Sequence, residues 1–399
     1  MVQARQSWLR SRPKNVFHQV DDQCTFAQAN GVALYRFDVG LPSGPAFLYA
    51  RKAAARAVMS IKEAMHTYQK NGSPGVPDFA RDFVLCHVPS LAKHLDKVAF
   101  VPVPGLKSMF ELIPRACGIP AERSRGVLYT MTDPGYPPPE DMCADLGIKK
   151  HRRLVTNMRN DFLFEPERTG ARKGDVIMIN YPHNPSGQVM NRAWLRQLCA
   201  HCEKYGIRLF NDAAYVFLDH TGKRVTLAEI AVEFPNLSWA EGFSASKIGN
   251  FTGWRIGAIV GSSDFIADIC RKKANIDSGF CAALALAVLR QLQNRPQDVE
   301  AMRLVYKRRL DGVISVLERY GMKLAFRPKA GAFSLWQTPR YAFGKRVVNA
   351  KFFNHELILR TGVVGVDFDP YYRVASFGDV EPMFPQLERA FKMAEVSYR

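Results

Sequence analysis

Short apolar runs recur through the middle of the chain, and several are followed by a longer amphipathic stretch. The runs occupy residues 97–103, 126–131, 175–182, 207–215, 239–246 and 256–262. They show little alternation of apolar and polar positions, which is typical of parallel strands buried on both faces. The stretch 190–206 has apolar residues at helical spacing between an asparagine start and a glycine stop. Strands alternating with helices predict an α/β domain whose mostly parallel sheet is covered by helices.

The pattern changes in the C-terminal third of the chain. Residues 299–321 form one long, charged, amphipathic stretch that predicts a helix. The expected elements beyond it are strands at 331–337 and 373–378, a helix near 348–361 and a closing helix from about 381. This mixture predicts a smaller α+β domain, with its boundary inside the helix-rich stretch 275–300. We therefore expect an N-terminal arm that is part of the small domain, a large domain and a small C-terminal domain, at residues 1–45, 46–285 and 286–399.

The composition fits a chain that buries a sizeable core. Of its 399 residues, 47% are hydrophobic and 23% are charged, close to the average of globular proteins. No apolar run approaches the roughly 18 residues of a membrane-spanning helix, so we expect no membrane association. The longest run, residues 281–289, predicts a buried helix.

The chain carries a strong positive charge. Lys and Arg number 55 and Asp and Glu 37, which gives a net charge of +18 at pH 7. Such an excess suggests nucleic acid, an anionic surface or an anionic small molecule as a partner. However, no recognised nucleic-acid fold accompanies the basic runs at 149–153 and 271–273. We therefore expect a solvated basic surface and no nucleic-acid partner.

The eight cysteines are scattered, and residues 1–20 lack the apolar core of a signal peptide. These observations favour reduced thiols and a cytoplasmic protein. Cys199 and Cys202 lie inside a predicted helix, and no second pair has zinc spacing, so we expect no metal site. The N-terminus carries four basic residues and no acid, which we interpret as a basic arm rather than a transit peptide: Arg5, Arg10, Arg12 and Lys14.

Candidate chemistry begins at Lys247, which follows an apolar strand. Ser244 and Ser246 precede this lysine, and Arg255 lies eight residues beyond it. Hydroxyl groups and an arginine placed together suit a phosphate, and small residues let the backbone approach a bound group closely. A lysine whose pKa is lowered by its pocket is a Schiff-base nucleophile. Taken alone, a surface lysine beside a structural arginine is the commoner explanation.

Two upstream elements add polar groups at strand ends. Asp212 closes the apolar run 207–215, and Tyr215 lies three residues further on. A carboxylate at this position can pair with a protonated ring nitrogen, although a helix N-cap is the commoner role. The turn Asn184-Pro185-Ser186-Gly187 follows the run 175–182, where an ordinary turn is the alternative interpretation.

The ordered set is more informative than its parts. From Asn184 there are 28 residues to Asp212, 35 more to Lys247 and 8 more to Arg255. This series closely resembles the fold-type I pyridoxal-phosphate-dependent aminotransferases of class I/II. The resemblance implies pyridoxal 5′-phosphate bound by Lys247 as a Schiff base, with Asp212 paired to its ring nitrogen. It also implies contacts from Asn184 and Tyr215 to the ring's phenolic oxygen, and from Ser244, Ser246 and Arg255 to the phosphate.

The resemblance spans roughly residues 35–395, and three further segments within it imply cofactor contacts. Residues 102–110 resemble a strand followed by a glycine turn and a helix start, whose free N–H groups cradle phosphate. That turn is Gly105, Leu106 and Lys107. Residues 133–139 resemble the segment whose aromatic residue, here Tyr136, stacks on the pyridine ring. Residues 68–84 resemble the segment whose tyrosine, here Tyr68, reaches the phosphate of the partner subunit, which implies a homodimer with shared active sites.

The resemblance also names substrate contacts. Gly40, in residues 37–45, corresponds to a glycine that approaches the substrate carboxylate. Asn184 is a second substrate contact. Arg373, in residues 371–378, corresponds to the arginine that holds the α-carboxylate as a bidentate fork.

The activity implied is a ping-pong transfer of an amino group between an amino acid and a 2-oxo acid. Lys247 would act as general base, with Asp212 and Tyr215 completing the catalytic set. The same fold and residues also support a pyridoxal-phosphate-dependent lyase, decarboxylase or oxidase. A regulator that uses the fold as a ligand sensor is a weaker alternative, because only about 35 residues precede the resemblance, too few for a winged helix.

Overall fold

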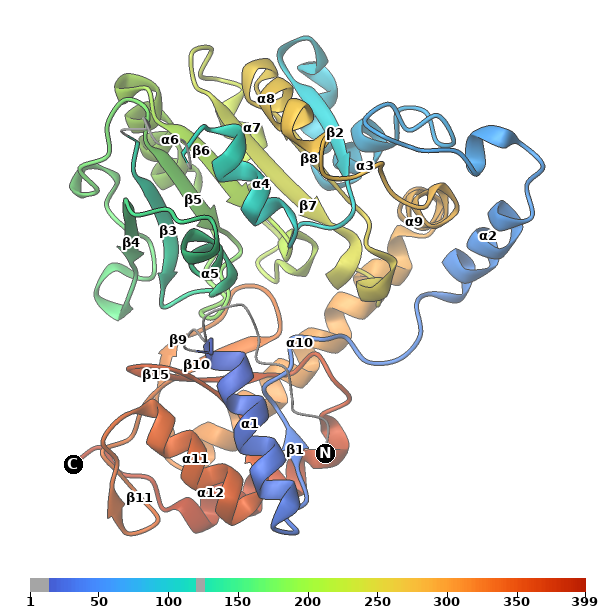
Figure 1. The fold of residues 1–399 in the computed structure, drawn as a ribbon. Helices are drawn as coiled ribbons and strands as arrows, with labels where there is room; N and C mark the ends of the chain where they lie inside the picture. Colours follow the sequence, from blue (N-terminus) through green and yellow to red (C-terminus); the bar gives the residue numbers. More distant parts are fainter. Residues whose placement is uncertain (1–13, 120–125) are drawn as a thin grey trace, which may run out of the picture.

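A seven-stranded sheet organises the larger body of the molecule (Figure 1). The computed structural model describes residues 14–119 and 126–399. In spatial order the strands are β2 (Ala99–Val103), β8 (Gly257–Gly261), β7 (Trp239–Ser244), β6 (Arg208–Asp212), β5 (Val176–Asn180), β3 (Leu128–Asp133) and β4 (His151–Val155). Six of them fall in the apolar runs of the sequence. The exception is β4, whose basic residues lie half exposed at the sheet edge and conceal its strand character.

One strand runs against the others. Neighbouring pairs from β7 through β6, β5 and β3 to β4 are parallel, so the expected mostly parallel sheet is confirmed. The expectation of a parallel strand at 256–262 was wrong, because β8 pairs antiparallel with both β7 and β2. Residues 245–256 contain only short 3-10 turns between β7 and β8. Since a parallel return needs a crossover that spans the sheet, the chain comes back in the opposite direction.

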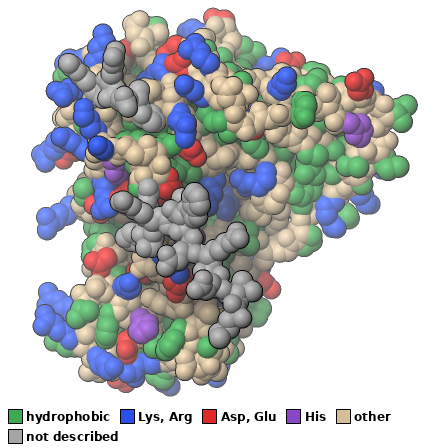
Figure 2. Space-filling view, in the orientation of Figure 1, with side chains coloured by type: hydrophobic (Ala, Val, Ile, Leu, Met, Phe, Trp, Pro, Cys, Tyr) green, Lys and Arg blue, Asp and Glu red, His purple; other side chains and the backbone are tan. Residues whose placement is uncertain are grey.

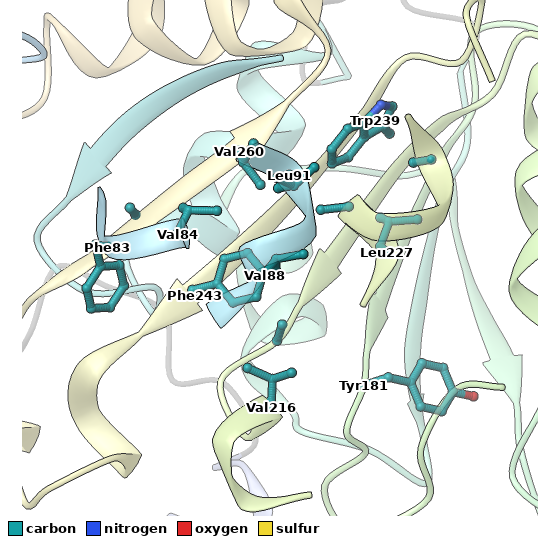
Figure 3. Close-up of a cluster of buried hydrophobic side chains, with 14 of the residues drawn as sticks. Phe83, Val84, Val88, Leu91, Tyr181, Val216, Leu227, Trp239, Phe243 and Val260 are labelled. Carbon is teal, nitrogen blue, oxygen red and sulfur yellow. The ribbon is translucent and has the colours of Figure 1, made fainter. Parts of the chain in front are cut away.

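Helices cover both faces of this sheet. The helices α3 (Phe79–His87), α6 (Arg192–Tyr205), α7 (Leu227–Ala231) and α9 (Ala282–Asn294) pack into the hydrophobic cluster on one face. Figure 3 shows part of that cluster, including Phe83 of α3, Val88 just beyond it and Phe243 of β7. The other face is covered by α4 (Met109–Ala116), α5 (Pro138–Asp145) and α8 (Ser263–Lys273). In β5, Ile177 packs on the first face and Met178 on the second, which explains the absence of polar alternation.

Two helix predictions can be checked at their ends. The predicted helix at 190–206 is α6, and Asn191 caps its start. The side-chain oxygen of Asn191 accepts a hydrogen bond from Trp194 N at 2.9 Å. The helix ends at Gly206 in the left-handed conformation, with φ of 61°. The run 281–289 lies in the buried helix α9. Among the described helices, none combines the length and apolar character needed to cross a membrane.

A second, smaller body lies below the large sheet in Figure 1. Its antiparallel sheet has the order β14 (Val366–Phe368), β15 (Tyr371–Ala375), β10 (Phe333–Gln337) and β9 (Leu324–Phe326). The helices α11 (Ala350–Thr361) and α12 (Phe384–Ala394) pack with it, and α10 (Pro296–Arg319) runs between the two bodies. The short strands pair separately: β1 (Tyr35–Arg36) with β13 (Val363–Val364), and β11 (Tyr341–Ala342) with β12 (Lys345–Arg346).

The N-terminal region is more structured than a basic arm. Residues Val16–Ala29 form the helix α1, which packs against α11 and β14. Three of the four basic residues noted in the sequence, Arg5, Arg10 and Arg12, lie outside the described residues. The next helix, α2 (Leu48–Val58), packs against α9 at the edge of the large body. All eight cysteines are free thiols, as the sequence predicts.

Candidate active site

A cavity of about 430 Å³ opens where the carboxyl ends of the central parallel strands face the smaller body. Asn180 ends β5, Asp212 ends β6 and Ser244 ends β7, and all three line the cavity. The carboxyl ends of parallel strands meet at one edge of a sheet, and in open α/β sheets this edge is where ligands bind. The smaller body closes the cavity with residues of β10 and β15.

Lys247 projects into this cavity from the loop after β7. Its Nζ donates a hydrogen bond to the backbone oxygen of Gly40 at 2.5 Å. Loss of solvent around the amine, with the nearby cations Arg255 and Arg373, lowers its pKa from 10.5 to about 8, against an opposing effect of Asp212. At pH 7 roughly a tenth of the amine is therefore unprotonated, far more than for a lysine of ordinary pKa. The unprotonated amine is the form that attacks a carbonyl carbon.

Asp212 is a buried carboxylate at the end of β6. Its Oδ1 accepts a hydrogen bond from Ala214 N at 3.2 Å. Burial raises the pKa of the carboxyl group to about 7, while the Ala214 N–H and the charge of Lys247 act in the opposite direction. The alternative of a helix N-cap does not hold, because the 3-10 turn that follows begins at Val216 with Tyr215 as its cap residue. A cation placed beside this carboxylate would restore its charged form.

Hydrogen bonds between strand ends fix the turn that carries Asn184. Asn180 Nδ2 donates to the backbone oxygen of Asp212 at 2.9 Å, and Asn180 Oδ1 accepts from Asn184 N at 3.0 Å. Asn184 Oδ1 in turn accepts from Arg373 Nη1 at 3.0 Å. The ends of β5 and β6 and the arginine of β15 are thus joined in one buried network.

The guanidinium of Arg373 lies almost fully buried between the two bodies. Its Nη2 donates to the backbone oxygen of Asp38, and its Nε has no hydrogen-bond partner among the described residues. Burial lowers its pKa to about 10, so the group stays cationic at neutral pH. Three aromatic rings surround it, with centroids 5.2, 4.8 and 5.3 Å from Cζ: Phe17, Phe333 and Phe368. Such a fork is suited to a carboxylate.

The opposite end of the cavity gathers groups that suit a phosphate. Arg255 Nη1 donates to Ser246 Oγ at 3.4 Å, and Ser244 Oγ accepts from Ser246 N at 3.2 Å. The turn before α4 lies beside Arg255, because a Cβ added at Gly105 would overlap the guanidinium. Gly105 also has φ of +79°, a conformation that L side chains rarely adopt. Leu106 and Lys107 follow on this turn and line the cavity.

The cavity brings together all but two of the residues singled out in the sequence. Tyr136, Tyr215 and the other predicted residues line it, whereas Gly105 lies behind Arg255. Tyr68 lies elsewhere: its side chain is 70% exposed and borders a separate surface depression. Among the described residues, no group of three or more His, Cys, Asp or Glu side chains has an arrangement that could hold a metal ion.

Several lining residues were missed in the sequence. Asn180 had a usable signal, since a polar residue at the end of an apolar strand marks the ligand-binding edge of a parallel sheet. Phe17 on α1 and Phe333 on β10 had none, because only the packing of distant segments brings them to the cavity. Val39 and Leu41 flank the predicted Gly40 and also line the cavity.

Comparisons with known proteins agree with this geometry. The family model described as aminotransferase class I and II matches residues 35–376. An LL-diaminopimelate aminotransferase of Natranaerobius thermophilus is 27% identical over 390 residues, covering 92% of this chain and 93% of that protein.

Solved structures share the fold. A substrate-bound BacF structure from Bacillus subtilis has a TM-score of 0.81 at 17% identity, covering 98% of this chain and 97% of that one. A probable N-succinyldiaminopimelate aminotransferase from Thermus thermophilus has a TM-score of 0.80 at 21% identity, covering 95% and 100%.

Proposed function

The chain belongs to the class I and II aminotransferase family, and we propose that it uses pyridoxal 5′-phosphate to move an amino group between an amino acid and a 2-oxo acid. The transfer follows a ping-pong cycle in which the 2-oxo acid formed from the amino donor leaves before the acceptor 2-oxo acid binds. The observation that carries the proposal is the convergence of Lys247, Asp212, Arg255 and Arg373 in one cavity.

The residues of the cavity fit this cofactor. Arg255, Ser244, Ser246 and the turn at Gly105 form a polar cradle for a phosphate, and the close contact of Gly105 with Arg255 leaves no room for a side chain there. Asp212 would pair with the protonated ring nitrogen, which offsets the cost of burying the carboxylate. Tyr136 offers a ring face, and Asn184 and Tyr215 offer polar groups, on the walls of the same cavity.

Each remaining residue acts on the substrate. Bound pyridoxal phosphate supplies an electrophilic carbon and a ring that withdraws electron density from the amino acid's Cα. Arg373 holds the α-carboxylate and so fixes the orientation of Cα. Lys247 Nζ, with its lowered pKa, takes the proton from Cα as general base. Gly40 lines the cavity beside the Phe333 ring, which an added Cβ would approach to 3.3 Å, and its missing side chain would leave room for the substrate carboxylate.

We also infer that the chain acts as a homodimer. The segment from α2 to Tyr68 carries exposed apolar side chains, including Ile61, which is fully exposed, and Met59. Apolar surface of this kind is typical of a protein interface. Tyr68 lies on this surface outside its own cavity, which supports a contact with the phosphate site of the partner subunit.

Substitution of Lys247 tests the proposed function. We expect Lys247→Ala to abolish both turnover and the absorbance of the lysine-bound cofactor, while the circular dichroism spectrum remains that of the parent protein. Lys307→Ala is the control, because Lys307 lies exposed on α10 and pairs with Asp311. A Lys247→Ala variant that retains covalently bound cofactor and turnover would overturn the proposal.

A further inference from the structure

The end of the cavity near Arg373 is walled by apolar side chains from the N-terminal region. Phe17 comes from the first turn of α1, and Val39 and Leu41 come from the loop after β1. Val39 is 37% exposed and Leu41 is 50% exposed, although both line a concave site. We call Phe17, Val39 and Leu41 the N-terminal wall. Apolar side chains left open on a cavity wall are typical of a surface that binds an apolar group.

Contacts to the carboxylate-binding arginine fix the position of this wall. The Phe17 ring lies 5.2 Å from Arg373 Cζ and 6.3 Å from the ring of Tyr136. The backbone oxygen of Asp38 accepts a hydrogen bond from Arg373 Nη2, which places Val39 next to the arginine. The start of α1 is itself held, because Asn15 caps its first turn and donates to Asp141 of α5 at 2.9 Å. A carboxylate bound at Arg373 therefore has Phe17 and Val39 beside it, and Leu41 lines the same cavity two residues further along the chain.

The charged side chains that line the cavity come from elements other than the N-terminal wall. Within residues 14–119 and 126–399, the charged side chains that line the cavity are Lys107, Asp212, Lys247, Arg255 and Arg373. Arg255 and Lys107 lie at the proposed phosphate end, since the Arg255 guanidinium packs against the turn that carries Lys107. Asp212 lies at the base of the cavity at the end of β6. Among the described residues of one subunit, the N-terminal wall itself offers no charged side chain to pair with a charged group at the far end of a substrate side chain, and an unpaired charge against an apolar wall is unfavourable.

From these observations we propose that the enzyme selects amino acids and 2-oxo acids with apolar side chains, and that Phe17 and Leu41 determine this selection. The inference rests on the proposed function, because it assigns Arg373 to the α-carboxylate. It separates this chain from its LL-diaminopimelate relatives, whose named substrate carries a second ammonium and carboxylate group. Binding of an apolar side chain is stabilised by its removal from water against the N-terminal wall.

Carboxylic acids without an amino group test the inference without turnover. Hexanoate and adipate share one carbon chain length and end in a methyl and a carboxylate group. Isothermal titration calorimetry with the cofactor-loaded protein should show hexanoate binding at least about tenfold more tightly than adipate. Equal or tighter binding of adipate would overturn the inference.

Variants then identify the residues responsible. Phe17→Ala should weaken hexanoate binding by about tenfold while leaving acetate, which reports on Arg373 alone, within about twofold. Phe26→Ala is a matched control, because Phe26 lies on the same helix with 57% of its side chain exposed and does not line the cavity. Leu41→Ser gives a second variant with little risk to the fold, since Leu41 is half exposed. Equal weakening of acetate and hexanoate would show that Phe17 only packs on Arg373, and would overturn its assigned role.

Kinetic measurements separate the proposed aminotransferase activity from the proposed preference for apolar side chains. In the half-reaction with amino donors, norleucine should exceed glutamate and lysine in kcat/KM by at least about tenfold. If no donor reacts and no lysine-bound cofactor forms, the proposed function fails. If donors react but glutamate or lysine matches norleucine, the proposed function stands and the inference about the side chain fails.

Discussion

Single side chains in the cavity owe their chemistry to loss of solvent and to neighbouring charge. Lys247 is the clearest case: desolvation and the cations Arg255 and Arg373 lower the pKa of its amine from 10.5 to about 8. Below that pH the amine is protonated and unreactive, and above it the free amine dominates. The rate at which the cofactor-free protein captures pyridoxal phosphate on Lys247 should therefore rise steeply up to about pH 8 and then level off.

Stopped-flow absorbance after mixing with the cofactor measures this rate, and borohydride reduction followed by peptide mapping confirms that Lys247 is the attachment site. Lys247→Ala provides the background of nonspecific capture by surface lysines. An amine of ordinary pKa would continue to gain rate well above pH 9. A rate that keeps rising to pH 10 would contradict the lowered pKa.

Arg373 supports a second prediction at this scale. The fork is held by Asn184 and by the backbone of Asp38, so its direction is fixed before a carboxylate arrives. Arg373→Lys keeps the charge but loses the planar pair of donors. We expect the KM for amino acid donors to rise by about 10- to 100-fold, with little change in the half-reaction of a simple alkylamine, which has no carboxylate. Arg340→Lys on the exposed surface is the control, and an unchanged KM in Arg373→Lys would show that another group binds the carboxylate.

The sequence predicts residues of the site only where they belong to an ordered motif. Lys247, Asp212 and Arg255 are recognisable because their order and spacing resemble those of a known family. Phe17 and Phe333 carry no such signal, since an aromatic residue in an amphipathic segment is normally part of a core. Both reach the cavity because α1 and β10 come from the smaller body and close over the strand ends.

Buried hydrogen bonds join several secondary-structure elements of the large body. Glu241 on β7 lies at the centre of this network. Its Oε1 accepts from Asn211 Nδ2 at 2.7 Å and from Leu227 N at 3.1 Å, and its Oε2 accepts from Ala228 N at 2.7 Å. Asn211 in turn bonds both backbone groups of Tyr181. One carboxylate therefore links β7, β6 and the start of α7.

Glu241→Gln should lower the free energy of unfolding by about 1–3 kcal/mol. The amide has a single acceptor oxygen, so its NH₂ group would face a buried N–H donor or leave one unbonded. Urea denaturation followed by fluorescence measures the change. Glu233→Gln is the matched control, because Glu233 pairs with Arg196 at the exposed surface, where ion pairs contribute little. A Glu241→Gln variant as stable as the parent protein would show that this bond network adds nothing to stability.

Secondary-structure elements were predictable where the local sequence determines them. They were less predictable where pairing with other strands determines their direction or position. The apolar runs located β2, β3, β5, β6, β7 and β8, and the Asn191 and Gly206 signals bounded α6 within a residue or two. The direction of β8 was not readable from its apolar run, because a buried strand has the same composition whichever way it runs. The strand β4 was hidden by its basic residues, which solvent accommodates at a sheet edge.

At the scale of the whole molecule, positive charge is spread rather than concentrated in the site. Figure 2 shows Lys and Arg side chains over much of the visible face, with Asp and Glu among them. Many arginines are paired at the surface, as Arg153 is with Glu140 and Arg196 with Glu233. The cavity uses only a few cations, including Arg255 and Arg373. The net charge of +18 therefore did not identify the ligand. The function was indicated instead by the motifs at the strand ends.

The proposed dimer leads to a prediction about mixed subunits. If Tyr68 completes the phosphate site of the partner subunit, Tyr68→Ala should weaken cofactor binding by about tenfold in its own homodimer. Lys247→Ala homodimers should be inactive. A hybrid dimer of one Lys247→Ala and one Tyr68→Ala subunit contains one site with both native residues and one site with neither.

Co-expression with two affinity tags isolates this hybrid, and size-exclusion chromatography with light scattering checks its mass. At a cofactor concentration that saturates the parent protein but not the Tyr68→Ala homodimer, the hybrid should recover roughly half the activity of the parent dimer. Recovery follows because the intact site combines Lys247 of one subunit with Tyr68 of the other. Were Tyr68 to act within its own subunit, the hybrid would hold only a Lys247→Ala site and a Tyr68→Ala site. Its activity would then match half that of the Tyr68→Ala homodimer, and the shared site would be ruled out.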